Sequence, residues 1–314
     1  MTRYVARRLV SLVPVLVTIG VVTFVIIHLI PGNPADVILG NQATAAQVAQ
    51  LTHQLGLDRP LWDQFVTWSA NALQGNLGQS IFYQQPVLPV VLSHLVPTAT
   101  LAAMSTAVSI AIALPAGLLA ASQRGRVLDR ALMAVSLLGV SVPGFWLAFM
   151  LILVFAVLLG WLPVAGYVPL SGGVGPWLSH LVLPVAVLAA GQSAIIARML
   201  RDGTLESLRQ PYIRTARAKG ATERSVLLGH ALPNAAIPTL TIVGNSLASL
   251  LSGVVVVEVV FGIPGIGNLI IQAMENRDYP LIEGVTLIVA LGYVAVNLVV
   301  DLLYALADPR VRLG

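Results

Sequence analysis

The sequence predicts an all-α polytopic membrane protein with six transmembrane helices. Hydrophobic residues make up 57% of its 314 residues and charged residues only 10%, whereas soluble domains carry about 25% charge. Six separate stretches also have the roughly 20 apolar residues that cross a ~30 Å hydrocarbon core. Because too little charge remains to cover a water-facing surface, the composition excludes a soluble enzyme and a disordered chain.

The six apolar stretches define the predicted spans. They lie near Leu9–Ile30, Thr98–Ser122, Leu132–Leu159, Leu178–Met199, Ile237–Val257 and Gly284–Leu306. The first run is too long for a cleaved signal peptide, so we interpret it as a retained helix. The third is long for one straight helix, and Pro143-Gly144 in its middle predicts a break or kink, because proline removes a backbone donor and clashes with the preceding turn.

The basic residues predict the orientation of these spans. Of the 17 Lys and Arg residues, 15 lie at the two termini and around the second and fourth loops. The opposite side holds only Arg59 and Arg277. Since cytoplasmic loops carry the excess of basic residues, both termini are predicted to be cytoplasmic.

This orientation divides the chain into three predicted parts. Residues 1–30 form the cytoplasmic N-terminus and the first helix, residues 31–96 an external loop, and residues 97–314 a five-helix core that carries a cytoplasmic loop at 200–236.

The external loop has its own helix signals. Thr44-x-x-Gln47 is a capping box, and Gly56 is suited to end the helix that follows it. Pro60 is suited to the first position of a second helix, which Gly75 ends. The loop is therefore predicted to form a helical hairpin over the outer mouth. It serves either as a lid that packs on the bundle or as a docking surface for an extracytoplasmic partner.

The cytoplasmic loop also contains a short predicted helix. Pro211 starts it, Gly220 ends it, and Thr222 is suited to cap another helix behind it. Tyr212, Ile213 and Ala216 are expected on one face, with arginines around them. Two interpretations remain open: a basic helix that lies on anionic lipid headgroups, or a helix that inserts into a cytoplasmic partner.

At this loop the sequence resembles the permeases of binding-protein-dependent ABC importers, which carry the pattern E-A-A-x3-G-x9-I-x-L-P. The matching positions are Ala216, Gly220, Leu232 and Pro233. Arg214 replaces the glutamate and His230 replaces the isoleucine.

Further pieces, in order along the chain, resemble the B-type subunits of the dipeptide, oligopeptide and nickel branch. They are Pro31-Gly32-Asn33-Pro34, Leu55-Gly56-Leu57-Asp58-x-Pro60, Gly75-Asn76-Leu77-Gly78-x-Ser80, Pro97-Thr98-x-x-Leu101, Glu258-x-x-Phe261-x-x-Pro264-Gly265-x-Gly267, Arg277-Asp278-Tyr279-Pro280 and Asp308-Pro309-Arg310-Val311-Arg312. Together they cover nearly the whole chain.

The resemblance implies a type I ABC importer permease of the bacterial cytoplasmic (inner) membrane. It implies a heterodimer with a C-type permease, two ATPase subunits or one fused ATPase, and an extracytoplasmic substrate-binding protein. ATP and Mg would be bound by the ATPase subunits, with no cofactor on this chain. The cargo would be di- or oligopeptides, with glutathione or nickel chelates as the alternative. The residues implied to couple to the ATPase are Tyr212, Arg214, Thr215, Ala216, Lys219 and Gly220.

Other chemistries find little support in the sequence. The only lysine, Lys219, precedes a glycine, so there is no Walker A motif. The chain has no cysteine for a disulfide, a thiolate metal site or a catalytic thiol. An intramembrane serine protease would need a Gly-x-Ser-Gly setting, which is absent. The net charge of +4 is spread over loops, which argues against a nucleic-acid partner.

A stand-alone secondary transporter is the distant alternative. It would normally place coupling carboxylates near the membrane midplane, but Glu258 and Asp301 fall near span ends.

Two stripes of small or polar residues stand out within the spans. One lies on the fifth span within an arc of about 80° at 3.6 residues per turn, and it either lines the translocation path or bonds to neighbouring helices. Its residues are Thr241, Asn245, Ser249 and Ser252. The other recurs every fourth residue of the second span and predicts a seam for close helix packing. Its residues are Ala99, Ala103, Ala107 and Ala111.

Overall fold

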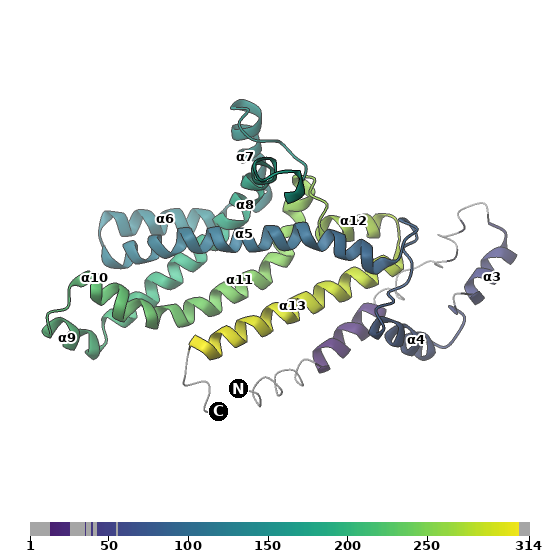
Figure 1. The fold of residues 1–314 in the computed structure, drawn as a ribbon, viewed down its shortest axis with the longest axis horizontal. Helices are drawn as coiled ribbons and strands as arrows, with labels where there is room; N and C mark the ends of the chain where they lie inside the picture. Colours follow the sequence, from purple (N-terminus) through teal and green to yellow (C-terminus); the bar gives the residue numbers. More distant parts are fainter. Residues whose placement is uncertain (1–12, 26–34, 36–38, 40–42, 55, 308–314) are drawn as a thin grey trace. The chain divides into compact units, whose positions relative to one another are not determined.

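The computed structural model describes residues 13–25, 35, 39, 43–54 and 56–307, and these are almost entirely helical (Figure 1). The described part contains no strand beyond one isolated bridge between Gln79 and Pro86. Its first helix covers Val13–Val25. The others are α3 (Ala45–Gln54), α4 (Leu61–Leu73), α5 (Val87–Ser122), α6 (Val127–Ser141), α7 (Gly144–Leu151), the π-helical η1 (Ile152–Leu158), the 3-10 turn η2 (Leu170–Gly172), α8 (Val174–Leu208), α9 (Pro211–Ala218), α10 (Glu223–Ser225), the π-helical η3 (Val226–Ala231), α11 (Leu232–Val260), α12 (Ile266–Glu275) and α13 (Tyr279–Ala307).

The six predicted spans correspond to six apolar helical segments. Four are long helices: α5, α8, the segment that runs through η3 into α11, and α13. The fifth is the pair formed by α6 with α7 and η1, and the sixth is the shorter helix Val13–Val25. Residues 9–12 and 26–30 of the first predicted span lie outside the described residues.

The predicted break at Pro143 is confirmed, and it is sharper than a kink. Val142 has extended backbone angles and Pro143 is the N-cap of α7. The chain bends by 102° between the two helices of the pair. The third apolar stretch is therefore a strongly bent pair of helices rather than one straight span.

The predicted spans differ most from the observed helices at the start of α5 and the end of α8. Helix α5 begins at Val87 and passes through Pro97, and α8 continues from the predicted end at Met199 to Leu208. The predictions counted only the residues needed to cross hydrocarbon. A helix can continue past the membrane because its backbone hydrogen bonds are internal.

The alanine stripe does not form the predicted seam within this chain. Its four members are exposed on α5. The inward face of α5 instead carries Leu101, Ser105, Ser109 and Ala113. Close approach to α8 occurs at Gly117, where an added Cβ would lie 2.8 Å from the carbonyl oxygen of Ala197. The two helices can approach closely here because Gly117 has no side chain, and the alanine stripe takes no part in this contact.

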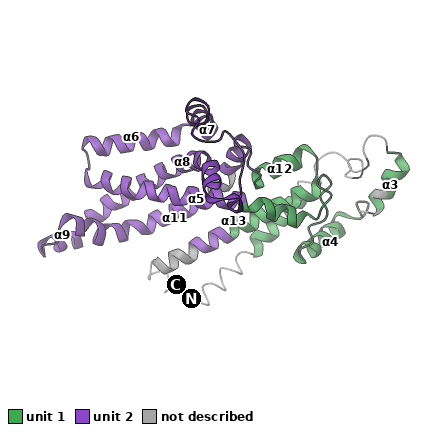
Figure 2. Ribbon diagram, turned by 45° about the horizontal axis from the view of Figure 1, so that its top comes forward, with its two compact units in different colours: residues 1–96, 264–294 green, residues 97–263, 295–314 purple. Residues whose placement is uncertain are grey.

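The helices group into two compact units, coloured separately in Figure 2. Unit 1 contains residues 1–96 and 264–294, and unit 2 contains residues 97–263 and 295–314. Each has its own apolar core. Unit 1 buries Val87, Val91, Leu269 and Leu281. Unit 2 buries Leu101, Leu181, Val254 and Phe261.

The helix signals predicted between Thr44 and Gly75 are largely confirmed. Thr44 and Gln47 form the capping box, with the Thr44 backbone N–H donating to Gln47 Oε1 at 2.9 Å. Gly56 and Gly75 follow α3 and α4 with φ of 69° and 78°. Pro60 is the N-cap of α4 rather than its first helical residue, since its ψ of 140° is not helical.

Candidate functional site

Pro211 and Gly220 fix the two ends of helix α9, and the buried Ile213 packs it against the rest of the chain. Gln210 has extended angles before Pro211, whose fixed φ suits the first helical position. Gly220 has a φ of 85°, a region that glycine enters without steric strain. Ile213 is completely buried, and α9 packs against η3. The helix is therefore fixed to unit 2.

The predicted coupling residues differ in exposure. Tyr212, Arg214, Thr215, Lys219 and Gly220 are exposed. Ala216 is only half exposed because it lies on the same face as the buried Ile213, three residues earlier. The prediction that Tyr212 and Ile213 share a face is wrong: Ile213 points into this chain while Tyr212 is 41% exposed.

An ion pair and a cap join α9 to the next helix. Arg217 Nε and Nη2 donate to the two Glu223 carboxylate oxygens at 2.8 and 3.0 Å. Thr222 Oγ1 accepts from the backbone N–H of Ser225, which confirms the predicted cap. Both partners of the ion pair are solvent-exposed. It therefore positions the turn and adds little stability.

Unit 2 contains a cavity of about 580 Å³ between α6–α7, α8 and α11. Its walls are mainly apolar, with polar groups from Gln192, Asn245 and Ser246. Of the predicted path residues, Asn245 lines it and the exposed Thr241 does not. The side chains of Ser249 and Ser252 lie outside the described part of the structure. A cavity of this size and lining has the character of a small-molecule site.

Gln192 connects three helices beside this cavity. Its Nε2 donates to the Ser246 carbonyl at 3.0 Å, and its Oε1 accepts from Ser109 Oγ at 3.1 Å. The side chain is nearly buried. It thereby satisfies polar groups of α5, α8 and α11 where hydrocarbon offers no water.

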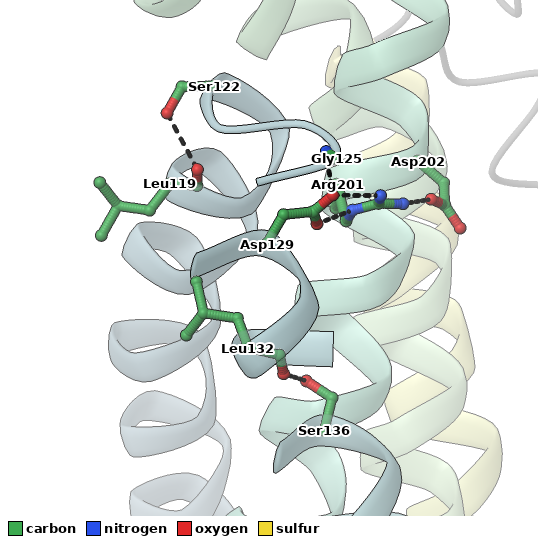
Figure 3. A network of polar contacts seen from close by, with 8 residues as sticks. All are labelled: Leu119, Ser122, Gly125, Asp129, Leu132, Ser136, Arg201 and Asp202. Atoms are coloured by element: carbon green, nitrogen blue, oxygen red, sulfur yellow. Dashed lines mark hydrogen bonds and ion pairs between the residues drawn. The ribbon is translucent and has the colours of Figure 1, made fainter. Parts of the chain in front are cut away.

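A second polar connection lies where α6 begins (Figure 3). Arg201 of α8 donates to both Asp129 oxygens, from Nε at 2.6 Å and Nη2 at 2.8 Å. The backbone N–H of Gly125 donates to Asp129 at 2.8 Å. Because Asp129 is only 3% exposed, this bidentate pair fixes the turn before α6 against α8, the helix that leads into α9.

Within unit 1, two of the sequence motifs meet at one carboxylate. Asp278 is fully buried and accepts from Ser80 Oγ at 2.5 Å and from the Phe82 backbone N–H at 3.0 Å. Tyr83 donates to Gln272 at 2.8 Å. Burial, and secondarily the Asp278 charge, raise the pKa of the Tyr83 hydroxyl. Asp278 thus fixes the segment before α5 to the start of α13.

The comparison with known families decides the assignment. The family described as "Binding-protein-dependent transport system inner membrane component" matches residues 113–313. Its N-terminal companion matches residues 1–102. The chain belongs to this family. It is a multi-pass inner-membrane permease subunit of a binding-protein-dependent ABC importer, which works with ATPase and substrate-binding subunits.

Two relatives match this permease over almost its whole length. A probable peptide ABC transporter permease protein of Sinorhizobium fredii is 45% identical over 309 residues, covering 98% of this chain and 99% of the relative. The glutathione transport system permease protein GsiC of Escherichia coli K12 is 40% identical over 312 residues, covering 99% of each. Among solved structures, this chain is similar to one titled "Crystal structure of an amino acid ABC transporter with histidines". The sequence identity is 20% and the TM-score is 0.51, and the match covers 71% of this chain and 94% of that one. It shows a shared fold.

Several polar residues of this permease escaped the sequence analysis. Gln192 is a lone amide in an apolar span, a signal that could have marked it, because polar groups inside a membrane are costly without partners. Asp129 and Arg201 are 72 positions apart, so no local pattern joins them. Glu258 was placed near a span end, yet it is completely buried and accepts from Thr98 Oγ1 at 2.6 Å.

Proposed function

We propose that this permease imports peptides, provides one half of the translocation path and docks on an ATPase subunit through α9. The observation that carries the proposal is the cavity of unit 2, whose polar groups converge from α8 and α11. The relatives named for peptide and glutathione transport support the cargo class. Glutathione is the second candidate cargo, and competition between it and a dipeptide in uptake assays separates the two.

The other half of the path would come from a C-type permease. The exposed alanine stripe of α5 supports this arrangement, because small side chains let a second helix approach closely. ATP and Mg would bind only to the ATPase subunits. Both termini would face the cytoplasm, in keeping with the distribution of 15 of the 17 basic residues.

The path is tested at Asn245. We expect Asn245→Leu to reduce peptide uptake several-fold in proteoliposomes while the complex still assembles and hydrolyses ATP. Thr241→Val, one helical turn away and outside the cavity lining, is the matched control and should transport normally. Normal uptake by Asn245→Leu would remove the cavity from the path.

The coupling role of α9 is tested at Gly220. Valine at a φ of 85° is strained by about 1–3 kcal/mol and should misdirect the end of α9. We expect Gly220→Val to lose both co-purifying ATPase and transport. Gly160→Val is the control, because Gly160 also has a positive φ and open space around it but lies in another loop. Full ATPase retention by Gly220→Val would favour a helix that lies on lipid headgroups.

A further inference from the structure

A second cavity, here called the outer cavity, lies within unit 1 and is separate from the proposed path. Its volume is about 240 Å³. Its walls come from the first helix, the turn after α3, helix α4 and the start of α13. The polar and charged lining residues are Arg59, Gln64, Thr67, Asn71 and Glu283. The aromatic lining residues are Phe24 and Trp68.

One wall of the outer cavity is a turn held in place by hydrogen bonds. Gln64 Nε2 donates to the backbone carbonyls of Leu57 at 3.1 Å and Arg59 at 2.8 Å. Gly56 has a φ of 69°, and an added Cβ there would lie 3.4 Å from Arg59 Nε. The Arg59 side chain therefore folds back over the turn, with its guanidinium beside the cavity.

The opposite wall is aromatic and carries a carboxylate. The rings of Trp68 and Phe24 have centroids 6.2 Å apart, and Phe24 packs edge-on against Phe65 at 5.4 Å. An added Cβ at Gly20 would lie 3.7 Å from the Trp68 ring. The carboxylate of Glu283, at the start of α13, belongs to the same cavity lining as Trp68.

These groups together favour a ligand that carries both a cationic and an anionic group. A carboxylate removed from bulk water is costly unless a cation or several donors accompany it. Aromatic faces attract cations as well. The guanidinium of Arg59, in turn, suits a phosphate or carboxylate. We propose that the outer cavity binds the primary ammonium group of a small zwitterion, with Glu283 as its counter-charge and Arg59 facing its anionic group.

The volume limits the ligand. Cavities for drug-sized ligands measure about 300–1,000 Å³, so the outer cavity suits a small head group. Two sources carry the required chemistry: the headgroup of phosphatidylethanolamine, and the amino-terminal end of a short peptide. The proposal goes beyond the transport function, because it concerns binding at a site that does not line the proposed path.

The test measures binding to the assembled complex, independently of transport. In the lipid arm, native mass spectrometry counts the phosphatidylethanolamine and phosphatidylcholine molecules that the complex retains. In the peptide arm, equilibrium dialysis measures radiolabelled glycylglycine binding to the complex in phosphatidylcholine nanodiscs. Phosphatidylcholine is the matched lipid, because its quaternary ammonium has no N–H to donate.

Glu283→Gln keeps the shape of the side chain but removes its charge. We expect it to weaken binding about tenfold or more in at least one arm, because hydrogen bonds to charged groups are among the stronger ones. Asp63→Asn, also in unit 1 but outside the cavity lining, should bind as the unchanged chain does.

Arg59→Gln changes an exposed residue and so leaves folding unaffected. It should weaken glycylglycine binding while ethanolamine, which lacks an anionic group, binds as before. A positive result in one arm alone identifies the source of the ammonium group. Equal retention of the two lipids together with unchanged glycylglycine binding in Glu283→Gln would overturn the proposal.

Discussion

Buried polar side chains in this permease form connections between elements that are distant in sequence. Gln192 bridges three helices, and Asp129 joins the turn before α6 to α8. The residue types were visible in the sequence, but their partners were not, because partner choice depends on how helices pack. The sequence did single out Asn245 through its polar neighbours at helical spacing, and the cavity includes it.

The buried ion pair yields the first prediction at this scale. Asp129→Asn replaces one carboxylate oxygen by a donor that faces Arg201, so we expect the complex to lose about 1–3 kcal/mol of stability. The measurement is the thermal melting of the detergent-solubilised complex.

Asp202→Asn is the matched control for this pair. Asp202 accepts from the same arginine at 2.8 Å, but its side chain is 57% exposed, and exposed ion pairs contribute about 0–1 kcal/mol. Equal melting temperatures for the two variants would show that burial of Asp129 does not strengthen its pairing.

The helices themselves were predicted well at their centres and poorly at their ends. Apolar run length marks a membrane crossing, and all six predicted stretches correspond to helical segments. The length of an apolar run does not indicate how far a helix continues beyond the membrane, so the start of α5 at Val87 and the end of α8 at Leu208 were missed. Local signals did better where they fix backbone angles, as at Pro143, Pro211 and Gly220.

Close approach between α5 and α8 leads to the prediction at the element scale. Gly117→Ala would place a Cβ 2.8 Å from a backbone oxygen of α8, which cannot move without shifting the helix. We expect a loss of about 1–3 kcal/mol, as for other overpacked sites, measured as lower yield and melting temperature of the complex.

Gly253→Ala tests whether this effect is specific. An ideal Cβ at Gly253 of α11 meets no heavy atom of the described residues within 4 Å. That variant should assemble and melt normally. If Gly117→Ala behaves like Gly253→Ala, the contact between α5 and α8 is looser than these distances indicate.

The grouping into two units reflects contacts that chain order hides. Residues 264–294 group with residues 1–96 in unit 1, although the two ranges are far apart in the sequence. The reason is long-range packing: Asp278 bonds to Ser80, and Leu77 and Val87 share a core with Leu281. Both partners of the Asp278 bond belong to motif pieces found in the sequence, but nothing local indicated that these pieces meet.

The orientation of the whole molecule is predicted by its charge distribution and can be tested directly. The chain has no cysteine, so a single introduced cysteine reports its own position. Gln50 of α3 and Arg124 of the turn before α6 are both exposed. Because 15 of 17 basic residues lie on the side that includes Arg124, an impermeant maleimide should label Gln50→Cys in spheroplasts and Arg124→Cys only after lysis. Labelling of both after lysis controls for reactivity. The reverse pattern in spheroplasts would invert the topology, and α9 would then face away from any cytoplasmic ATPase.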